Sequence, residues 1–248
     1  MSGFAPEAEA MVPPPPVGRI FEREIRPGIA DVTPSGRVRL DAIARWLQDV
    51  AYLDVVDAGF EHRGAWIVRR SRIRAEVWPV FGEDLVLRTF CSGIGRFCAE
   101  RRTVIRGASA EVEAVAIWVC LDPERMVPMR FDEEFFAVYS ESAGDRGASV
   151  RLRHPRPPAD AERRQWTFAI THLDLAGHVN NSHYWELIET DLGAGATVGA
   201  LEAEVEHHAP AQAGEVALLR NGGGIWVEDP EGELLASIML LASGASGA

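Results

Sequence analysis

Residues Asp174–Asn181 read Asp-Leu-Ala-Gly-His-Val-Asn-Asn, and the earlier stretch Thr33–Leu40 reads Thr-Pro-Ser-Gly-Arg-Val-Arg-Leu. The glycines and the valines of the two stretches match at one constant spacing, because 177 minus 36 and 179 minus 38 both equal 141. Each stretch predicts a strand end, a glycine turn and a helix start. Only the later one carries an acid, a histidine and two asparagines. This repetition predicts a duplicated fold in which one copy is equipped for chemistry.

A second pair of stretches occurs in the same order. Gly82-Glu-Asp-Leu-Val-Leu-Arg88 is matched by Gly214-Glu-Val-Ala-Leu-Leu-Arg220, at a spacing of 132 residues (214 minus 82). The later copy is therefore nine residues shorter between its helix and this strand. Two matches in one order favour duplication over coincidence.

The length and composition are those of an ordinary globular protein. A chain of 248 residues can form one large domain or two small ones. It has no apolar run long enough to span a bilayer, so no membrane association is expected. It also lacks a basic patch followed by an apolar stretch at its start, so a cytoplasmic location is expected. The three cysteines, Cys91, Cys98 and Cys120, form no close pair and are interpreted as reduced core thiols.

The charged residues limit the possible partners and chemistry. The net charge of −12 disfavours nucleic acid as a partner. All 25 basic residues are arginine, which excludes Schiff-base chemistry through lysine. Ten arginines and five acids lie between Glu61 and Arg106. This cluster either docks an acidic, phosphate-bearing partner or forms an ordinary solvated sheet face.

The hydrophobic periodicity predicts one arrangement of elements that occurs twice. Alternation of Leu201, Ala203 and Val205 with glutamates indicates a half-exposed strand. A strand, a glycine turn, a long helix and an antiparallel meander are typical of the hot dog fold. The fold class expected is thus α+β, a tandem hot dog with two antiparallel sheets, each wrapping a long central helix. The expected segments are a disordered lead-in (1–17), a first hot dog with a degenerate site for substrate or partner binding (18–140), a linker (141–163), a second, catalytic hot dog (164–242) and a frayed tail (242–248). The expected helices span 40–56 and 179–192, and the expected strands span 19–29, 66–77, 83–90, 97–106, 111–121, 166–172, 201–206, 215–220, 225–227 and 233–241.

The later glycine turn carries the candidate chemistry. Asp174 is expected to end a strand and His178 to begin a helix, where unpaired backbone N–H groups favour negative charge. Such N–H groups can polarise a carbonyl, and a carboxylate beside them can activate water or attack directly. Asn180 and Asn181 can hold a substrate carbonyl, a water or the acid. The alternative is that Asp174 and Asn180 only cap the helix. Function is favoured because capping needs a single polar group and this turn has four.

The segment Asp174–Asn181, continued by Ser182-His-Tyr-Trp185, resembles the signature of plant and bacterial acyl-acyl-carrier-protein thioesterases. The first-copy segments 31–49, 66–70 and 92–102 resemble this family as well, so the resemblance runs from about Phe21 to Leu241. It implies a thioester hydrolase of fatty acid biosynthesis that releases a free fatty acid from acyl carrier protein. It implies no cofactor and no metal, and a monomer or homodimer.

The site departs from the plant members at two positions, because Ala176 stands in place of an asparagine and Pro210 in place of a catalytic glutamate. The turn also resembles the Asp-Pro-Ala-Gly turn of hydroxybenzoyl-CoA thioesterases. From these resemblances Asp174 is expected to be the base or nucleophile, His178 to orient or stabilise, and Asn180 to position water or substrate. Substrate binding is expected from Gly177, Val179 and Asn181, with backbone N–H groups near 177–179 as the electrophilic site. Possible assisting residues are Gln48, Asp49, Glu189 and Glu206.

Three other functions remain open. An acyl-CoA thioesterase would act on another anionic thioester. A hot dog hydratase would carry its Asp and His five residues apart, whereas Asp174 and His178 are four apart. A non-catalytic acyl-binding protein would lack the family's asparagine and glutamate, which this chain replaces with Ala176 and Pro210.

His207 and His208 are expected on opposite faces of a strand, which disfavours a metal site. Tryptophans such as Trp46, Trp66 and Trp185 are expected in the core or lining an acyl tunnel.

Overall fold

The computed structural model describes residues 11–193 and 198–241, which form one large antiparallel sheet with helices on one of its faces. Residues 1–10 of the expected lead-in (1–17) and the expected tail over 242–248 lie outside the described residues. The strands are β1 (Phe21–Ile25), β2 (Ala65–Val77), β3 (Leu85–Ile94), β4 (Cys98–Arg106), β5 (Glu111–Leu121), β6 (Glu162–Phe168), β7 (Leu201–His207), β8 (Gly214–Asn221), β9 (Gly224–Glu228) and β10 (Leu234–Leu241). The helices are α1 (Leu40–Asp57), α2 (Glu133–Ala143) and α3 (Trp185–Leu192), with 3₁₀ turns η1 (Ile29–Asp31), η2 (Ile170–His172) and η3 (Asn181–Tyr184).

The order of the strands shows the duplication directly. The first half runs β1-β3-β4-β5-β2 and the second runs β7-β10-β9-β8-β6, so the second half repeats the first in reverse across the sheet. The two halves meet where β2 pairs with β7, and the ten strands form one continuous sheet. The α+β tandem hot dog is confirmed, with its two expected sheets joined edge to edge.

The glycine turns are equivalent in the two halves. An isolated bridge joins Val32 to Val38, and another joins Leu173 to Val179, again 141 residues further on (173 minus 32). Gly36 and Gly177 lie within these turns with φ of +84° and +74°. Such a conformation strongly favours glycine because it has no Cβ atom.

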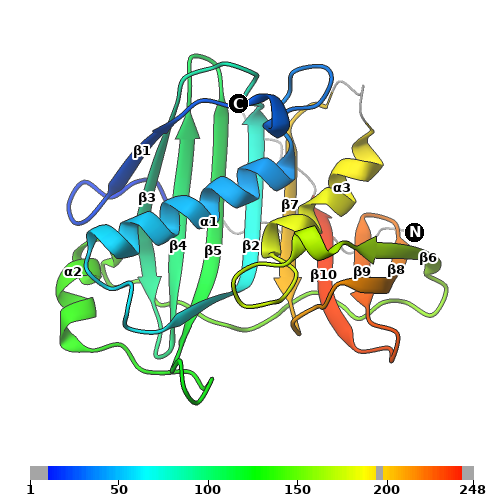
Figure 1. The fold of residues 1–248 in the computed structure, drawn as a ribbon. Helices are drawn as coiled ribbons and strands as arrows, with labels where there is room; N and C mark the ends of the chain where they lie inside the picture. Colours follow the sequence, from blue (N-terminus) through cyan, green and yellow to red (C-terminus); the bar gives the residue numbers. More distant parts are fainter. Residues whose placement is uncertain (1–10, 194–197, 242–248) are drawn as a thin grey trace.

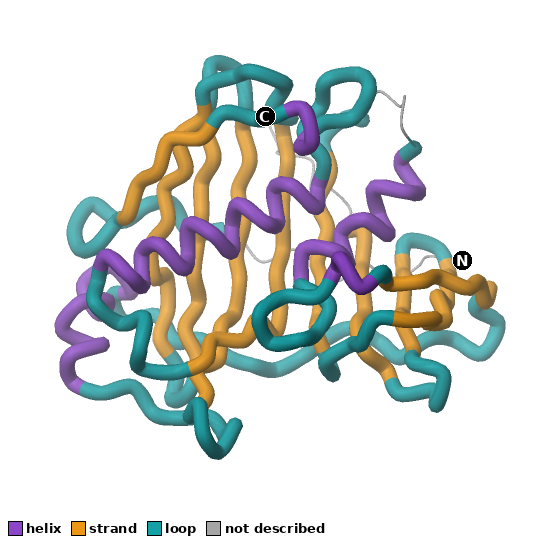
Figure 2. The backbone as a smooth tube through the Cα atoms, viewed as in Figure 1, coloured by secondary structure: helices purple, strands orange, loops and turns teal. Residues whose placement is uncertain are grey.

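The central helices differ between the halves. α1 crosses the concave face of β2 to β5, and the shorter α3 lies beside it over the second half (Figures 1 and 2). α1 begins at Leu40 as the periodicity predicts, and it buries Ile43, Trp46 and Val50 on one face. The continuous helix expected over 179–192 is wrong. Helical structure begins at Asn181 as a 3₁₀ turn and becomes α-helical at Trp185.

The opposite face of the sheet is covered by the segment between the halves, which passes across it on the way from α2 to β6 (Figure 1). Glu206 accepts hydrogen bonds from the backbone N–H groups of Arg153 (2.6 Å) and His154 (3.0 Å). The half-exposed strand expected over 201–206 is therefore wrong, because Glu202 is 3% and Glu206 0% exposed. Salt bridges compensate this burial: Arg72 reaches Glu202 at 3.1 Å and Arg70 reaches Glu204 at 3.6 Å across the β2–β7 seam. The domain boundaries expected around this segment stay a prediction.

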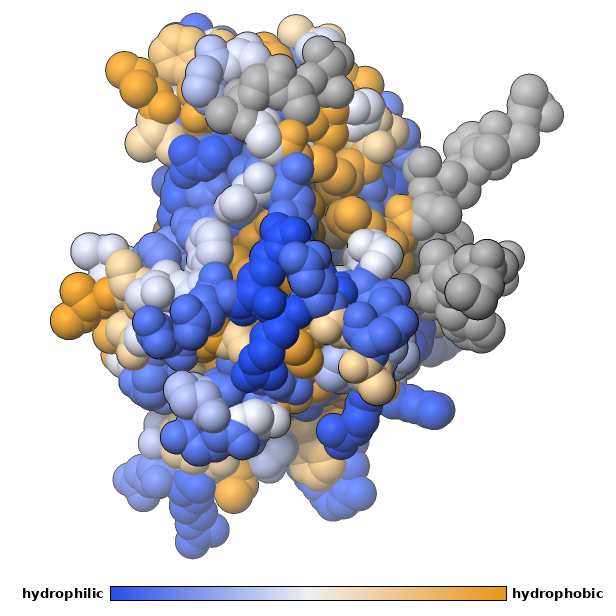
Figure 3. Space-filling view, turned by 90° about the vertical axis from the view of Figure 1, so that its right-hand side faces the viewer, coloured by the Kyte–Doolittle hydropathy of each residue, from blue (hydrophilic) through white to orange (hydrophobic). Residues whose placement is uncertain are grey.

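The outer edge of the second half is protected by charge. β6 is an edge strand, and Glu162, Arg163 and Arg164 are exposed on it. Seen from this side, the surface is mostly hydrophilic with apolar residues scattered among the polar ones (Figure 3). Charged edge strands resist pairing with other chains. No helix among the residues that the structure describes is long and apolar enough to cross a bilayer.

Candidate active site

The turn at Asp174 is held in shape by its own backbone. The Gly177 N–H donates to the Asp174 carbonyl at 2.9 Å, and the Asp174 N–H donates to the His178 carbonyl at 2.9 Å. The Asp174 carboxylate accepts the Ala176 N–H through Oδ1 at 2.9 Å. Its Oδ2 has a long contact of 3.5 Å with Nδ2 of Asn180. The carboxylate is exposed and oriented, with Oδ2 largely free for a substrate or water.

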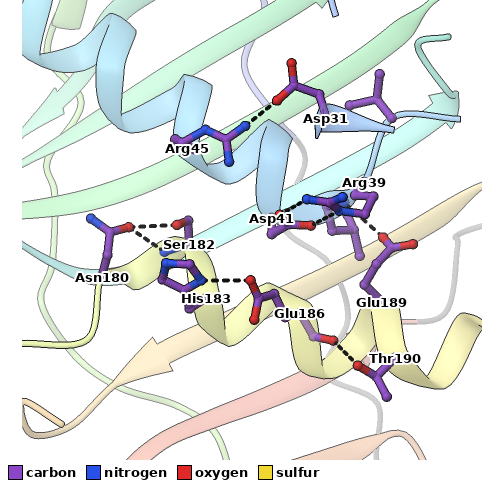
Figure 4. Close-up of polar contacts among 12 residues, drawn as sticks. Asp31, Arg39, Asp41, Arg45, Asn180, Ser182, His183, Glu186, Glu189 and Thr190 are labelled. Atoms are coloured by element: carbon purple, nitrogen blue, oxygen red, sulfur yellow. Dashed lines mark hydrogen bonds and ion pairs between the residues drawn. The ribbon is translucent and has the colours of Figure 1, made fainter. Parts of the chain in front are cut away.

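Asn180 is fixed by residues from both halves of the chain. Its Oδ1 accepts the Ser182 N–H at 3.0 Å, the Ser182 hydroxyl at 2.8 Å and Nε2 of Gln48 at 2.8 Å. Three donors on the oxygen leave the Nδ2 group to face Asp174. Gln48 comes from α1, so the first half of the chain completes the site on the second. Figure 4 shows the contacts of Asn180 with Ser182.

A cavity of about 470 Å³ opens beside this turn and extends into the first half. Asp174, Leu175, Ala176 and Asn180 line it at the turn. Apolar and aromatic side chains line much of the rest, between α1 and the concave face of the sheet: Ala51, Tyr52, Val55, Phe60, Trp66, Cys91, Ala99, Trp118 and Phe135. This volume lies in the usual range for small-molecule sites. A carboxylate at the end of an apolar cavity is suited to a reaction at one end of a hydrocarbon chain.

The other residues predicted for the site lie around the turn rather than in the cavity. His178 is half-buried and does not line the cavity, and its ring has no hydrogen-bond partner among the described residues. Val179 is buried, and its N–H donates to the Ala211 carbonyl at 2.9 Å. Asn181 begins η3 and lines a smaller cavity of about 30 Å³.

The backbone N–H groups at the turn are mostly occupied. Those of Ala176, Gly177 and Val179 donate within the protein, so the expected row of free amides at a helix start is reduced. Within the described parts of the chain, the N–H groups of Leu175 and His178 have no acceptor. These two are the donors available at the turn.

The equivalent site in the other half is closed. Adding the repeat spacing of 141 to Gln48 gives Glu189, and adding it to Arg37 gives His178. Arg37 forms a salt bridge with Glu189, and Glu189 also accepts the Leu40 N–H at 2.9 Å. Both charged side chains are nearly buried, 8% and 10% exposed. In this half, the Arg37–Glu189 ion pair therefore occupies the place that Gln48 and the turn at Asp174 line in the open site.

Pro210 occupies the position of the expected family glutamate. It is exposed and follows β7, one residue before Ala211, whose carbonyl holds the Val179 N–H. The site thus has no carboxylate at this position. Among the expected tunnel residues, Trp66 lines the main cavity, while Trp46 and Trp185 are buried in the core. Trp118, another tryptophan expected in the core or in a tunnel wall, also lines the cavity.

The remaining histidines belong to other environments. His207 packs against Tyr184 at a ring distance of 5.1 Å, while Nε2 of His208 contacts the Ser237 hydroxyl at 3.0 Å. Burial, followed by nearby positive charge, lowers the pKa of His207 to about 3. Two groups have ligand-type atoms close enough for a metal ion: His172 with His183 and Glu186, and His154 with Glu204 and Glu206. In both groups a histidine already contacts a glutamate, at 2.8 Å and 3.2 Å.

Most arginines of the cluster between 61 and 106 pair with acids of the same chain. The pairs are Arg63 with Asp132 and Glu134, Arg70 with Glu204, Arg72 with Glu202, Arg74 and Arg102 with Glu113, Arg88 with Glu22, Arg101 with Asp54, and Arg106 with Glu111. Pairing neutralises their charge toward a partner. This favours the interpretation of the cluster as an ordinary sheet face.

Comparison with known proteins agrees with this geometry. Residues 18–139 match the model of the acyl-ACP thioesterase N-terminal domain. Uncharacterized proteins from two strains of Mycobacterium tuberculosis are 25% identical over 215 residues, covering 85% of this chain and 86% of theirs. An acyl-ACP thioesterase from Bacteroides thetaiotaomicron has a TM-score of 0.73 at 16% identity, covering 90% of this chain and 97% of its own. The 12:0-ACP thioesterase from Umbellularia californica has a TM-score of 0.69 at 14% identity, covering 90% and 96%.

The fold and the family match define a double hot dog thioesterase. Residues 18–139 match the acyl-ACP thioesterase N-terminal domain family, and the predicted resemblance to acyl-ACP thioesterases is confirmed. The predicted class of enzyme, a thioester hydrolase, is that of the family.

Proposed function

We propose that the protein hydrolyses fatty acyl thioesters of acyl carrier protein during fatty acid biosynthesis, with Asp174 as the general base. The single observation that carries this proposal is the apolar cavity of about 470 Å³ that ends at the Asp174 carboxylate. The family match over residues 18–139 supports the carrier-protein thioester as the substrate. A cytoplasmic location and a monomeric or homodimeric state remain predictions.

The proposed reaction assigns one role to each group at the turn. Oδ2 of Asp174 takes a proton from water as the water oxygen attacks the thioester carbonyl. The N–H groups of Leu175 and His178 stabilise the charge that develops on the carbonyl oxygen. The tetrahedral intermediate then collapses, the C–S bond breaks, and the carrier thiolate leaves and takes up the proton held by Asp174. The free acid is released. The His178 ring, without a partner among the described residues, is available to stabilise the leaving thiolate.

Asn180 and Gln48 act through position. Gln48 holds Oδ1 of Asn180 at 2.8 Å, and this orients the amide so that Nδ2 faces Asp174. Gln48 is therefore proposed as a positioning residue. The backbone around Gly177 and Val179 shapes the turn, and Asn181 begins the helical segment behind it.

The direct test is hydrolysis of a chain-length series of thioesters, each prepared on acyl carrier protein and on coenzyme A. The proposal predicts a higher kcat/KM for the carrier-protein thioester at matched chain length. Faster turnover of the coenzyme A series at both low and high salt would favour the acyl-CoA thioesterase. Binding of acyl chains with no turnover of either series would favour the non-catalytic alternative.

A further inference from the structure

A cluster of charged and polar side chains lies at the cavity around Asp54, which is six residues after Gln48 on α1. Asp54 is 1% exposed. Its Oδ2 accepts hydrogen bonds from Nη2 of Arg101 at 2.7 Å and from the hydroxyl of Tyr139 at 3.1 Å. Its Oδ1 accepts Nε of Arg19 at 2.6 Å. Arg101 and Tyr139 both line the cavity. A cavity expected to hold a hydrocarbon chain therefore has a guanidinium group in its wall.

Arg101 keeps hydrogen-bonding capacity that the protein does not use. A guanidinium group has five N–H donors in a fixed plane. One donates to Asp54, and Nη1 has only a long contact of 3.4 Å with Thr89. Its Nε has no partner among the described residues, and the side chain remains 11% exposed. Asp54 already accepts three donors, so it has room for at most one more.

Other side chains around the cavity carry unpaired polar atoms. The indole nitrogens of Trp66 and Trp118 and one carboxylate oxygen of Glu61 are buried without a hydrogen-bond partner. All three side chains line the same cavity. A buried polar group without a partner is unfavourable, and a saturated hydrocarbon tail would supply none.

The charges of the cluster indicate which kind of polar ligand fits. Arg19 and Arg101 are matched by Asp54 and Asp57, two positive groups against two negative ones. Burial, more than the neighbouring charges, raises the pKa of Tyr139 to about 12, so its hydroxyl is neutral. A carboxylate tail would find no uncompensated positive charge here. A neutral oxygen would find free N–H donors.

We infer that the cavity selects acyl chains that carry a neutral oxygen, a hydroxyl or keto group, which accepts a hydrogen bond from Arg101. Six residues of helix span about 9 Å, which places this oxygen roughly seven carbons from the thioester. The inference rests on the proposed function, because it takes the thioester to lie at Asp174.

The test compares carrier-protein thioesters of one length, about twelve carbons, either unsubstituted or hydroxylated at one carbon between about the fifth and the tenth. At one position the hydroxylated chain is expected to exceed the unsubstituted chain in kcat/KM by at least tenfold. In Arg101→Lys, which keeps a charge beside Asp54, this ratio should fall to within threefold of one. The matched control is Arg102→Lys, on the next residue of β4, whose side chain pairs with Glu113 instead and does not line the cavity.

A binding measurement separates failure of this inference from failure of the proposed function. Tryptophan fluorescence reports binding of the free acids, because Trp66 and Trp118 line the cavity. If no thioester is hydrolysed, the proposed function is overturned, while tighter binding of one hydroxylated acid still supports the inference. If the unsubstituted chain is turned over and bound as well as every hydroxylated chain, the inference is overturned. An unchanged preference in folded Arg101→Lys would also overturn it.

Discussion

At the scale of single residues, the proposed chemistry depends on how side chains orient one another around Asp174. Asn180 can present its Nδ2 group to the carboxylate only while its Oδ1 is held by Ser182 and Gln48. Among the described residues, Gln48 forms a hydrogen bond with Asn180 and none with the Asp174 carboxylate or the backbone of the turn, so its contribution is one of position.

Replacing Gln48 tests this role. Gln48→Leu is expected to lower kcat by about tenfold with little change in KM, since one hydrogen bond of about 1.4 kcal/mol corresponds to one factor of ten. Steady-state kinetics on a single acyl thioester provide both values. A loss of kcat that is accompanied by a clear drop in melting temperature would indicate a structural role for Gln48 instead of a positioning role. A change confined to KM would also contradict the positioning role.

His207 predicts a pH dependence of stability. Its pKa is about 3 in the folded protein, mainly because of burial, against 6.5 as the ordinary value. The unfolded chain therefore binds a proton between about pH 6.5 and pH 3 that the folded chain does not. The contribution of this group is complete above pH 6.5 and decreases as the pH falls, by up to about 1.4 kcal/mol per pH unit.

The variant His207→Leu should have a flatter dependence of unfolding free energy on pH across this window, as measured by urea denaturation at several pH values. His62→Leu is the control, because that side chain is 93% exposed. A wild-type slope in His207→Leu would show that other groups cause the acid sensitivity.

At the scale of secondary structure elements, the two helices α1 and α3 reach across to each other's half, but with different results. Gln48 on α1 completes an open site, and Glu189 on α3 closes the equivalent one with Arg37. Glu189→Gln removes one partner of a nearly buried ion pair, which is expected to cost about 3 kcal/mol of unfolding free energy. Hydrolysis by the folded variant should stay within twofold of wild type, whereas a tenfold loss would place Glu189 in the active site.

The sequence predicted the elements whose pattern is local. The periodicity of Leu40, Ile43 and Trp46 indicated α1, and the repeated glycines indicated both turns. It did not predict that the glutamates after Leu201 would be buried, because the arginines of β2 and the segment around His154 that cover them are distant in the chain. The sequence predicted an acyl tunnel with tryptophans in its wall, but not which segments form it, since its walls come from both halves of the chain.

At the scale of the whole molecule, the proposed active site is composite, because most of the cavity wall and Gln48 belong to the first half and Asp174 to the second. The segment 158–160 is exposed between the halves, where chain breaks are best tolerated. Co-expressed fragments 1–158 and 159–248 are expected to associate through the β2–β7 pairing and to hydrolyse acyl thioesters. Neither fragment alone should do so, and activity of 159–248 by itself would contradict a composite site.

The central claim is that the Asp174 carboxylate at the end of the cavity performs the chemistry, and Asp174→Asn tests it most directly. The side chain is exposed, so the substitution should leave stability within about 0.5 kcal/mol of wild type. The account predicts a loss in kcat of about 10² to 10⁴-fold on acyl-carrier-protein thioesters, the usual contribution of a general base, with acyl-chain binding retained. A folded Asp174→Asn protein that turns over the same thioester within tenfold of the wild-type rate would contradict it.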